Sequence, residues 1–255
     1  MNVKEIIAVV TGGASGLGEA TVRKVIRNGG KAVIADRDTE KGEKLAEELG
    51  SQTLFAEVDV TSEEDINAML DTAIEHFGQV NTVVNCAGIV VGEKVIGREG
   101  PHRLSSFSKV VEVNLIGTFN MIRLAAERMK HNEPNEEGER GVFVNTASIA
   151  AFDGQIGQAA YSASKSGVIG MTLPISRELA RYGIRVMTIA PGLFETPMFS
   201  QLPDNAREAL GDMTPFPKRL GKPYEYAKLV LSITENPMLN GEVIRLDGAI
   251  RMQPK

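Results

Sequence analysis

Short apolar runs alternate with longer stretches of mixed polarity along most of the chain. Runs rich in Val, Ile and Ala predict buried strands, and apolar residues at helical spacing predict the helices between them. The expected strands cover residues 6–10, 31–35, 53–58, 80–84, 142–146, 184–189 and 243–246. The expected helices cover residues 17–27, 38–49, 62–77, 105–130 and 158–181, with Asp38 and Ser62 as caps and Pro174 kinking or ending the last.

The order of these elements predicts one α/β domain. Strand and helix alternate throughout, which favours parallel strand pairing with helices on both faces of the sheet. Because no repeat, linker or low-complexity stretch divides the chain, residues 1–255 are expected to form a single Rossmann-type, doubly wound domain. Residues 90–104 form a polar insert, and the acidic stretch 132–139 predicts an exposed loop.

Composition and charge narrow the class of protein. Apolar residues make up 42% of the chain and aromatic residues 5%, with no Trp, which suits an aliphatic core on buried parallel strands. A net charge of -5 and a pI near 5.4 argue against general nucleic-acid binding. The single cysteine, Cys86, indicates a reducing compartment. No apolar run approaches the roughly 18 residues of a membrane span. The first expected strand leaves no room for a signal peptide, so a cytoplasmic protein is expected.

A glycine-rich turn follows the first expected strand, where residues 11–18 read Thr-Gly-Gly-Ala-Ser-Gly-Leu-Gly. Glycine lets the backbone approach a phosphate closely. The next helix offers free N–H groups and the positive end of its dipole to a pyrophosphate. Many surface turns look similar, but the position directly after the first strand favours a dinucleotide site.

Asp36 ends the second expected strand. A carboxylate there can accept hydrogen bonds from an adenosine ribose and repel a 2′-phosphate. Without the glycine-rich turn at residues 11–18, Asp36 would be better interpreted as a solvent-exposed turn residue. Arg37 complicates the choice, because a guanidinium can bind a phosphate. Ser15 in the glycine turn supplies no second positive charge, so NAD is favoured over NADP.

Tyr161 and Lys165 stand four residues apart on an expected helix and therefore project from one face. A free phenol has a pKa of about 10, and a nearby ammonium can lower it. Tyr161 could then exchange a proton with a substrate oxygen, and Lys165 could also hold a nicotinamide ribose. Most Tyr/Lys pairs at this spacing, however, are ordinary neighbours on a helix surface.

Two further polar residues complete the candidate set. Ser148 follows the fifth expected strand, at the sheet edge where ligand sites gather, and can hold a substrate oxygen or act as a cap. Asn114 is a mediocre helix former inside an expected helix. It could disturb that helix and pass a proton or water toward Lys165, or simply be exposed.

Together these motifs resemble the short-chain dehydrogenase/reductase family over nearly the whole chain. The matching residues are 11–18, 85–88 (Asn-Cys-Ala-Gly), Asn114, Ser148, 161–165 (Tyr-Ser-Ala-Ser-Lys), Pro191 and Gly192. Longer stretches, at residues 145–148, 157–165, 170–174, 183–194 and 240–252, resemble the branch of the family that acts on 3-hydroxyacyl-CoA thioesters and hydroxysteroids. The resemblance implies a Rossmann fold, NAD(H) and a homotetramer.

The resemblance also implies roles by position. Catalytic roles fall to Asn114, Ser148, Tyr161 and Lys165, and substrate contacts to Ser148, Gln158 and Tyr161. Cofactor contacts fall to Gly12, Ser15, Gly16, Leu17, Gly18, Asp36, Asp59, Val60, Cys86, Tyr161, Lys165, Phe194 and Thr196. Within that set, Ser15 and Leu17 would meet the phosphates, Asp59 and Val60 adenine, and Phe194 and Thr196 the nicotinamide end. Glu195 departs from the family pattern and would alter acyl preference or face solvent.

The expected reaction is the reversible oxidation of a 3-hydroxyacyl-CoA to the 3-oxoacyl-CoA. Residues 193–216 combine apolar side chains with prolines, which fits a mobile cover over an acyl or steroid body or an ordinary helix over the core. In the insert, Lys94, Arg98, His102 and Arg103 could receive coenzyme A phosphates or lie in a solvated loop.

Three alternatives remain open. A hydroxysteroid or other secondary-alcohol dehydrogenase would use the same catalytic residues, and an acyl-carrier-protein-linked 3-oxoacyl reductase would prefer NADPH. A protein of another class would be an NAD-binding scaffold without turnover. Cys86 has no paired base and is expected in the wall of the cofactor groove. The three histidines show no spacing typical of a metal site.

Overall fold

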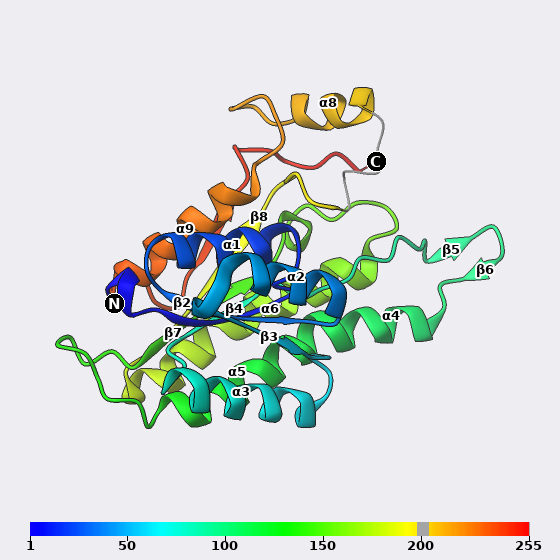
Figure 1. Cartoon of the computed structure of the whole chain (residues 1–255). Coiled ribbons are helices and arrows are strands. Elements are labelled where there is room, and N and C mark those ends of the chain that lie inside the picture. Colours follow the sequence, from blue (N-terminus) through cyan, green and yellow to red (C-terminus); the bar gives the residue numbers. More distant parts are fainter. Residues whose placement is uncertain (198–203, 255) are drawn as a thin grey trace.

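The computed structural model of the chain describes residues 1–197 and 204–254, except for the side chains of residues 204–207. Seven parallel strands form one central sheet in this part of the chain (Figure 1). They are β1 (Ile7–Thr11), β2 (Lys31–Asp36), β3 (Thr53–Glu57), β4 (Thr82–Asn85), β7 (Gly141–Thr146), β8 (Ile184–Pro191) and β9 (Val243–Leu246). The sheet order is β3-β2-β1-β4-β7-β8-β9. Strands β2 and β3 are added on one side of β1, and the strands from β4 onward are added on its other side, so the order of strands reverses between β1 and β4. A ligand crevice is expected beyond the carboxyl ends of the strands at that point.

Helices cover both faces of the sheet (Figure 1). One face carries α1 (Gly16–Arg27), α2 (Thr39–Leu49) and α9 (Pro223–Glu235). The other carries α3 (Glu63–Phe77), α5 (Gly117–Met129) and α6 (Ala159–Leu179), with α4 (Leu104–Val111) beside α6. Other helical segments in the described part of the chain include α8 (Asp204–Asp212), η1 (Val3–Glu5), η2 (Gly50–Gln52), η3 (Glu112–Ile116), η4 (Ile149–Ala151) and η5 (Ala180–Tyr182).

The core explains why the strands read as continuous apolar runs. Side chains alternate along β1, so that Val9 packs with one helical layer while Ala8 and Val10 pack with the other. All five residues of β1 are buried, as expected for a parallel strand covered on both faces. The predicted α/β fold with a seven-stranded parallel sheet is confirmed.

The helix expected over residues 105–130 is divided into three parts. The α-helix α4 passes into a π-helical segment, η3, and then into α5. Asn114 lies in the π-helical segment, which fits the expectation that it disturbs the helix. The helix expected over residues 158–181 continues past Pro174 to Leu179, so of the two effects expected of the proline, ending the regular part of the helix was wrong.

Other expectations need correction. The insert contains a small hairpin, β5 (Ile96–Gly97) and β6 (Gly100–Pro101), which projects from the molecule as an arm (Figure 1). Helix α9 was not predicted. In the acidic loop, Glu139 is buried because its carboxylate lies 2.7 Å from Arg185 and 3.1 Å from the Met1 ammonium. No helix among the described residues is long and apolar enough to cross a membrane.

Candidate active site

The turn between β1 and α1 brings Gly12, Gly13 and Gly18 into close contact with neighbouring backbone. Gly12 has a φ of +63°, and a Cβ placed on it would lie 2.9 Å from the Ala87 nitrogen. A Cβ on Gly18 would overlap the Gly12 carbonyl. The backbone can therefore pack this tightly only with glycine at these positions. Ser15 is the N-cap of α1, but its side chain makes no capping hydrogen bond within the described structure. The first turn of α1 thus presents donors suited to a phosphate.

Asp36 supports this turn from the end of β2. One carboxylate oxygen accepts a hydrogen bond from the Ala14 N–H at 3.0 Å and the other accepts one from the Asp38 N–H at 3.1 Å. The next side chain, Arg37, is largely exposed and lies 3.5 Å from the Asp59 carboxylate. Hydrogen bonds from Thr61, assisted by the Arg37 charge, hold the pKa of Asp59 below its ordinary value.

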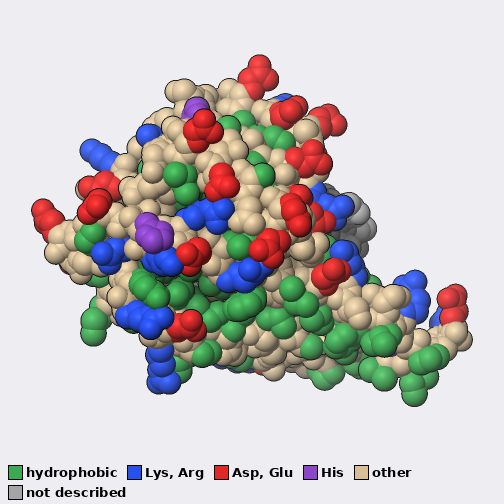
Figure 2. Space-filling view, turned by 90° about the horizontal axis from the view of Figure 1, so that it is seen from below, with side chains coloured by type: hydrophobic (Ala, Val, Ile, Leu, Met, Phe, Trp, Pro, Cys, Tyr) green, Lys and Arg blue, Asp and Glu red, His purple; other side chains and the backbone are tan. Residues whose placement is uncertain are grey.

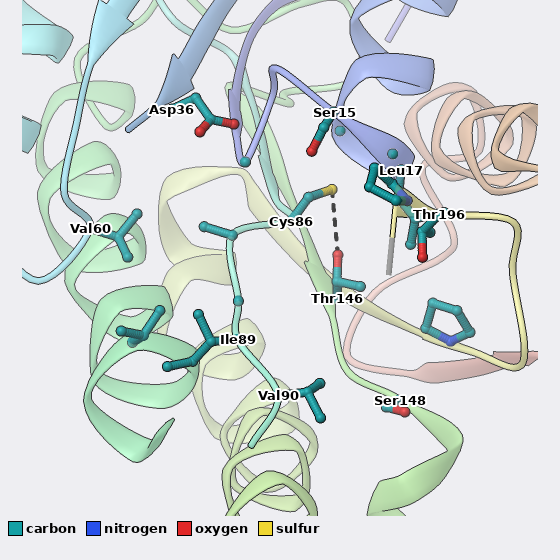
Figure 3. Close-up of a pocket in the computed structure, with 18 of the residues that line it drawn as sticks. Ser15, Leu17, Asp36, Val60, Cys86, Ile89, Val90, Thr146, Ser148 and Thr196 are labelled. Atoms are coloured by element: carbon teal, nitrogen blue, oxygen red, sulfur yellow. Dashed lines mark hydrogen bonds between the residues drawn. The ribbon is translucent and has the colours of Figure 1, made fainter. Parts of the chain in front are cut away.

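A cavity of about 500 Å³ extends from this turn to the end of β7. Figure 3 shows Ser15, Leu17 and Asp36 at one part of its wall and Ser148 at another. Of the predicted site residues, those lining it are Gly12, Ser15, Gly16, Leu17, Gly18, Asp36, Asp59, Val60, Cys86, Ser148, Tyr161, Lys165, Phe194 and Thr196. The glycine backbone, the helix N-terminus and the Asp36 carboxylate together fit a nicotinamide dinucleotide.

Lys165 is 5% exposed, and its Nζ donates a hydrogen bond to the Thr146 carbonyl at 2.7 Å. Its ammonium lies 5.8 Å from the centre of the Tyr161 ring. Burial lowers the pKa of Lys165 to about 8. Burial also raises the pKa of Tyr161, an effect that a hydrogen bond with Ser148 opposes. In this structure the pKa of Tyr161 is therefore raised rather than lowered, because burial has a larger effect than the hydrogen bond with Ser148.

Ser148 has a structural contact as well as a place at the cavity. It is the N-cap of η4, and its Oγ accepts a hydrogen bond from the Ala150 N–H at 3.1 Å. Its capping role and its position in the cavity wall are compatible, because a hydroxyl can accept one hydrogen bond and donate another.

Asn114 is fully buried, which rules out its interpretation as an exposed helix residue. Its Oδ1 accepts from the Ile89 N–H at 2.8 Å, and its Nδ2 donates to the Ile89 carbonyl at 2.9 Å. Nδ2 also donates to the Ser164 hydroxyl at 3.1 Å. These contacts clamp the segment after β4 to α6. Asn114 is not among the residues that line the cavity.

Sequence reasoning missed two partners of Cys86. Cys86 Sγ lies 3.6 Å from Thr146 Oγ1 and 3.7 Å from the Tyr226 hydroxyl, and these two oxygens lie 2.7 Å apart (Figure 3 shows the Cys86–Thr146 contact). Burial raises the pKa of the Cys86 thiol, which suits the expected groove residue rather than a nucleophile. The position of Thr146 at the end of β7 was a usable signal, whereas Tyr226 lies on the helix that was not predicted.

Several predicted residues lie elsewhere. Gln158 is not among the residues lining the cavity, and its Oε1 accepts a hydrogen bond from the Gln155 N–H at 3.2 Å. Glu195 is exposed and borders a separate hollow with Arg219 and Asp212. In the insert, the Arg103 guanidinium lies 3.3 Å from the Glu93 carboxylate. Of the insert, only Val90 lines the cavity.

The expected cover at residues 193–216 is described only in part. Met198, Phe199 and Leu202 lie outside the described residues. Phe194 is buried in the cavity wall, and Phe216 is 82% exposed.

Comparisons with known proteins agree with this geometry. A model of the short chain dehydrogenase family matches residues 6–207. A protein named 3-hydroxyacyl-CoA dehydrogenase type-2 from Bos taurus is 58% identical over 255 residues, covering 99% of this chain and 98% of its own. The protein of that name from Drosophila melanogaster is 55% identical over 254 residues, covering 99% and 100%. The crystal structure of a 3-hydroxyacyl-CoA dehydrogenase type-2 from Mycobacterium avium has a TM-score of 0.95 and 44% identity, covering 99% and 98%. The chain therefore belongs to the short-chain dehydrogenase family of oxidoreductases, whose members use a nicotinamide dinucleotide.

Proposed function

We propose that this protein reversibly oxidises a 3-hydroxyacyl-CoA to the 3-oxoacyl-CoA with NAD. The observation that carries the reaction type is that Ser148, Tyr161 and Lys165 line the same cavity as the glycine turn. The substrate class is supported by the names of the Bos taurus and Drosophila melanogaster relatives, which match the chain over nearly its full length.

The cofactor proposed is NAD rather than NADP. The glycine turn and the N-terminus of α1 would hold the pyrophosphate. Asp36 would accept hydrogen bonds from the adenosine ribose and repel a 2′-phosphate. Arg37 lies beside the Asp59 carboxylate, which competes with a phosphate for its charge. When bound, the nicotinamide ring supplies or takes up the hydride.

The side chains near Ser148 would bind the substrate oxygen and transfer its proton. Ser148 would orient the substrate oxygen by hydrogen bonding, and Tyr161 would exchange a proton with that oxygen. Lys165 would hold the nicotinamide ribose. The raised pKa of Tyr161 keeps its phenol protonated at neutral pH, as proton donation to a 3-oxo group requires. Oxidation of the alcohol requires the phenolate, so its rate should increase with pH. Asn114 would act indirectly, by fixing the Ile89 backbone against α6.

The first test is Tyr161→Phe, assayed by NADH oxidation with acetoacetyl-CoA. Removing a positioned proton donor typically costs about 10²–10⁴-fold in rate, so turnover should fall by at least about 10²-fold. NADH affinity, measured by fluorescence, should change little. Tyr224→Phe is the matched control, because Tyr224 is 58% exposed and does not line the cavity. Unchanged turnover in Tyr161→Phe would exclude the proposed role.

The same assay, repeated with other substrates and with NADPH, distinguishes the alternative functions. Turnover with a steroid or another secondary alcohol but not with acetoacetyl-CoA would indicate a hydroxysteroid or general alcohol dehydrogenase. A preference for NADPH in direct competition with NADH would indicate an acyl-carrier-protein-linked reductase. NADH binding with no turnover on any of these substrates would indicate a scaffold.

The proposed assembly is a homotetramer in the cytoplasm. Exposed apolar side chains on adjacent elements support self-association, namely Leu104 on α4, Ile116 in η3, Phe119 on α5 and Leu173 on α6. The free thiol of Cys86 is consistent with a reducing compartment.

A further inference from the structure

We propose that the C-terminal segment, residues 245–254, positions the substrate side of the active site, with Arg245 as its central positioning residue. We call this segment the C-terminal clasp. The inference rests on the proposed function for the identity of the substrate. The clasp's contacts and its location in the fold do not depend on that identity.

Arg245, at the third position of β9, joins the clasp to the loop that follows η4. Its guanidinium donates to the Asp153 carboxylate at 2.7 Å and to the Asp247 carboxylate at 2.7 Å. It also donates to the Ile250 carbonyl at 3.1 Å and lies 4.9 Å from the centre of the Phe152 ring. The Arg245 and Asp153 side chains are only about one-fifth exposed, and Asp247 is 7% exposed. This partly buried, multidentate arrangement fixes the guanidinium in one orientation.

The end of the clasp forms two further hydrogen bonds with the loop that follows η4. The Ile156 N–H donates to the Pro254 carbonyl at 3.0 Å, and Gln155 Nε2 donates to the Gln253 carbonyl at 3.1 Å. We call residues 152–158 the substrate loop, since they connect Ser148 and η4 to the start of α6, which carries Tyr161. Movement of this loop would change the relative positions of the two groups expected to hold the substrate oxygen.

The clasp contains a strained turn at Gly248 and Ala249. Gly248 has a φ of +59° and Ala249 a φ of +68°, a conformation that residues with a side chain rarely adopt. The turn is held by the Asp247 carboxylate, which accepts from the Ala249 N–H at 3.0 Å, and by Ile250, which is 1% exposed. Non-glycine residues keep such a conformation only where surrounding contacts impose it.

The same turn touches two other segments near the cavity. The Phe216 N–H donates to the Gly248 carbonyl at 3.3 Å, at the end of the expected cover. A Cβ on Gly192 would lie 2.9 Å from the Asp247 Cα, and Gly192 lines the cavity. The clasp therefore connects the substrate loop, the end of the cover and the turn after β8.

The part of the cavity that would hold the adenosine and pyrophosphate is built from different elements. The glycine turn follows β1, Asp36 ends β2 and Asp59 follows β3, whereas β9 is the opposite edge of the sheet. Loosening the clasp should therefore weaken productive substrate binding while NADH binding is retained. A residue that only stabilised the fold would affect both ligands together.

The experiment compares Arg245→Met with the wild-type protein. We expect the KM for acetoacetyl-CoA to rise about 10-fold, with the Kd for NADH within about twofold of wild type. Asp153→Asn, which removes the charge but keeps the size, should change KM in the same direction by a smaller factor. Arg128→Met is the matched control, because Arg128 pairs with Asp71 between α5 and α3, away from the clasp. Its KM for acetoacetyl-CoA should remain at the wild-type value.

Hydrogen exchange gives a readout that does not require turnover. With NADH bound, peptides from the substrate loop should exchange faster in Arg245→Met and Asp153→Asn, whereas peptides from the glycine turn should not. If wild-type protein fails to reduce acetoacetyl-CoA, the proposed substrate is wrong, and the exchange result still decides the role of the clasp. Unchanged exchange in the substrate loop, or equal weakening of NADH and substrate binding, would overturn the inference. If Arg245→Met does not fold, Asp153→Asn supplies both measurements.

Discussion

At the scale of single residues, Lys165 is held in an environment that is unfavourable for its charge. Its pKa falls from an ordinary value of 10.5 to about 8 because the side chain is buried. The folded state therefore binds fewer protons than the unfolded chain between about pH 8 and 10.5. Stability should increase with pH across that window, and below pH 8 the full cost of burial applies. A shift of this size corresponds to roughly 3 kcal/mol at neutral pH.

Lys165→Met should consequently make the protein more stable and inactive. The variant avoids burying a charge but loses the hydrogen bond to Thr146, so a net gain of about 2 kcal/mol in the free energy of unfolding is expected at pH 7. Urea unfolding at pH 7 measures the gain, which should shrink as the pH approaches 10.5. Lys44→Met, at an exposed position, should stay within about 0.5 kcal/mol of wild type. A destabilised Lys165→Met would mean that the buried ammonium is better compensated than its hydrogen bond to Thr146 indicates.

Some of the site residues predicted from the sequence line the cavity and others do not, and the difference depends on what fixes the position of each side chain. Ser15, Asp36 and Tyr161 line the cavity as expected, because turns and helix spacing fix where such side chains lie. Asn114 and Gln158 do not line it, because their side chains form hydrogen bonds with neighbouring segments. Those bonds depend on tertiary packing, which a local pattern does not specify. The direction of the Tyr161 pKa shift was missed for the same reason, since it depends on burial.

At the scale of elements, the sequence predicted strands better than helices. Each strand of the central sheet overlaps one of the seven expected strands, and Val243–Leu246 has the expected bounds. Helix α9 starts at Pro223 and buries Tyr226 and Val230 against the sheet, but it follows a stretch rich in turn residues and was overlooked. The arm was read as an irregular insert because its two strands have two residues each. Such a short hairpin leaves almost no alternating pattern.

The β1–α1 turn gives a prediction at this scale, because two of its glycines have different surroundings. A methyl group on Gly18 would overlap the Gly12 backbone, so Gly18→Ala must displace the turn and should cost about 2 kcal/mol or more in stability. On Gly16 the nearest atom would be Pro197 Cδ at 3.4 Å, and only the positive φ of +53° opposes a side chain. Gly16→Ala should therefore cost about 1–2 kcal/mol.

NADH affinity and thermal unfolding of the two variants test this difference. Gly18→Ala should lose most of its NADH affinity, whereas Gly16→Ala should retain a measurable part of it. Equal effects in the two variants would show that backbone conformation, rather than close approach to Gly12, determines the requirement for glycine.

At the scale of the whole molecule, the surface is divided between charged and apolar regions. Figure 2 shows a band of hydrophobic side chains across one face, continuing onto the projecting arm. Ile96 on the arm is 82% exposed, and Leu104 at the start of α4 is 77% exposed. A monomer rarely exposes so continuous an apolar region, which is typical of a protein interface. Self-association would cover this band, and a symmetric interface would place each of its residues at the contact twice.

Phe119→Arg should disrupt this self-association. Phe119 is 47% exposed on α5, close to Ile116, and in a two-fold interface the substitution would introduce two positive charges into one apolar contact. Light scattering should give about 110 kDa for wild type, four times the 27.5 kDa of the chain, and a lower mass for the variant. Met238→Arg is the control, because Met238 is 91% exposed and follows α9, a helix that covers the face of the sheet opposite α5. Its mass should equal that of wild type. If Phe119→Arg also keeps the wild-type mass, the α5 face is not an interface, and if wild type is already a monomer, the band has another role.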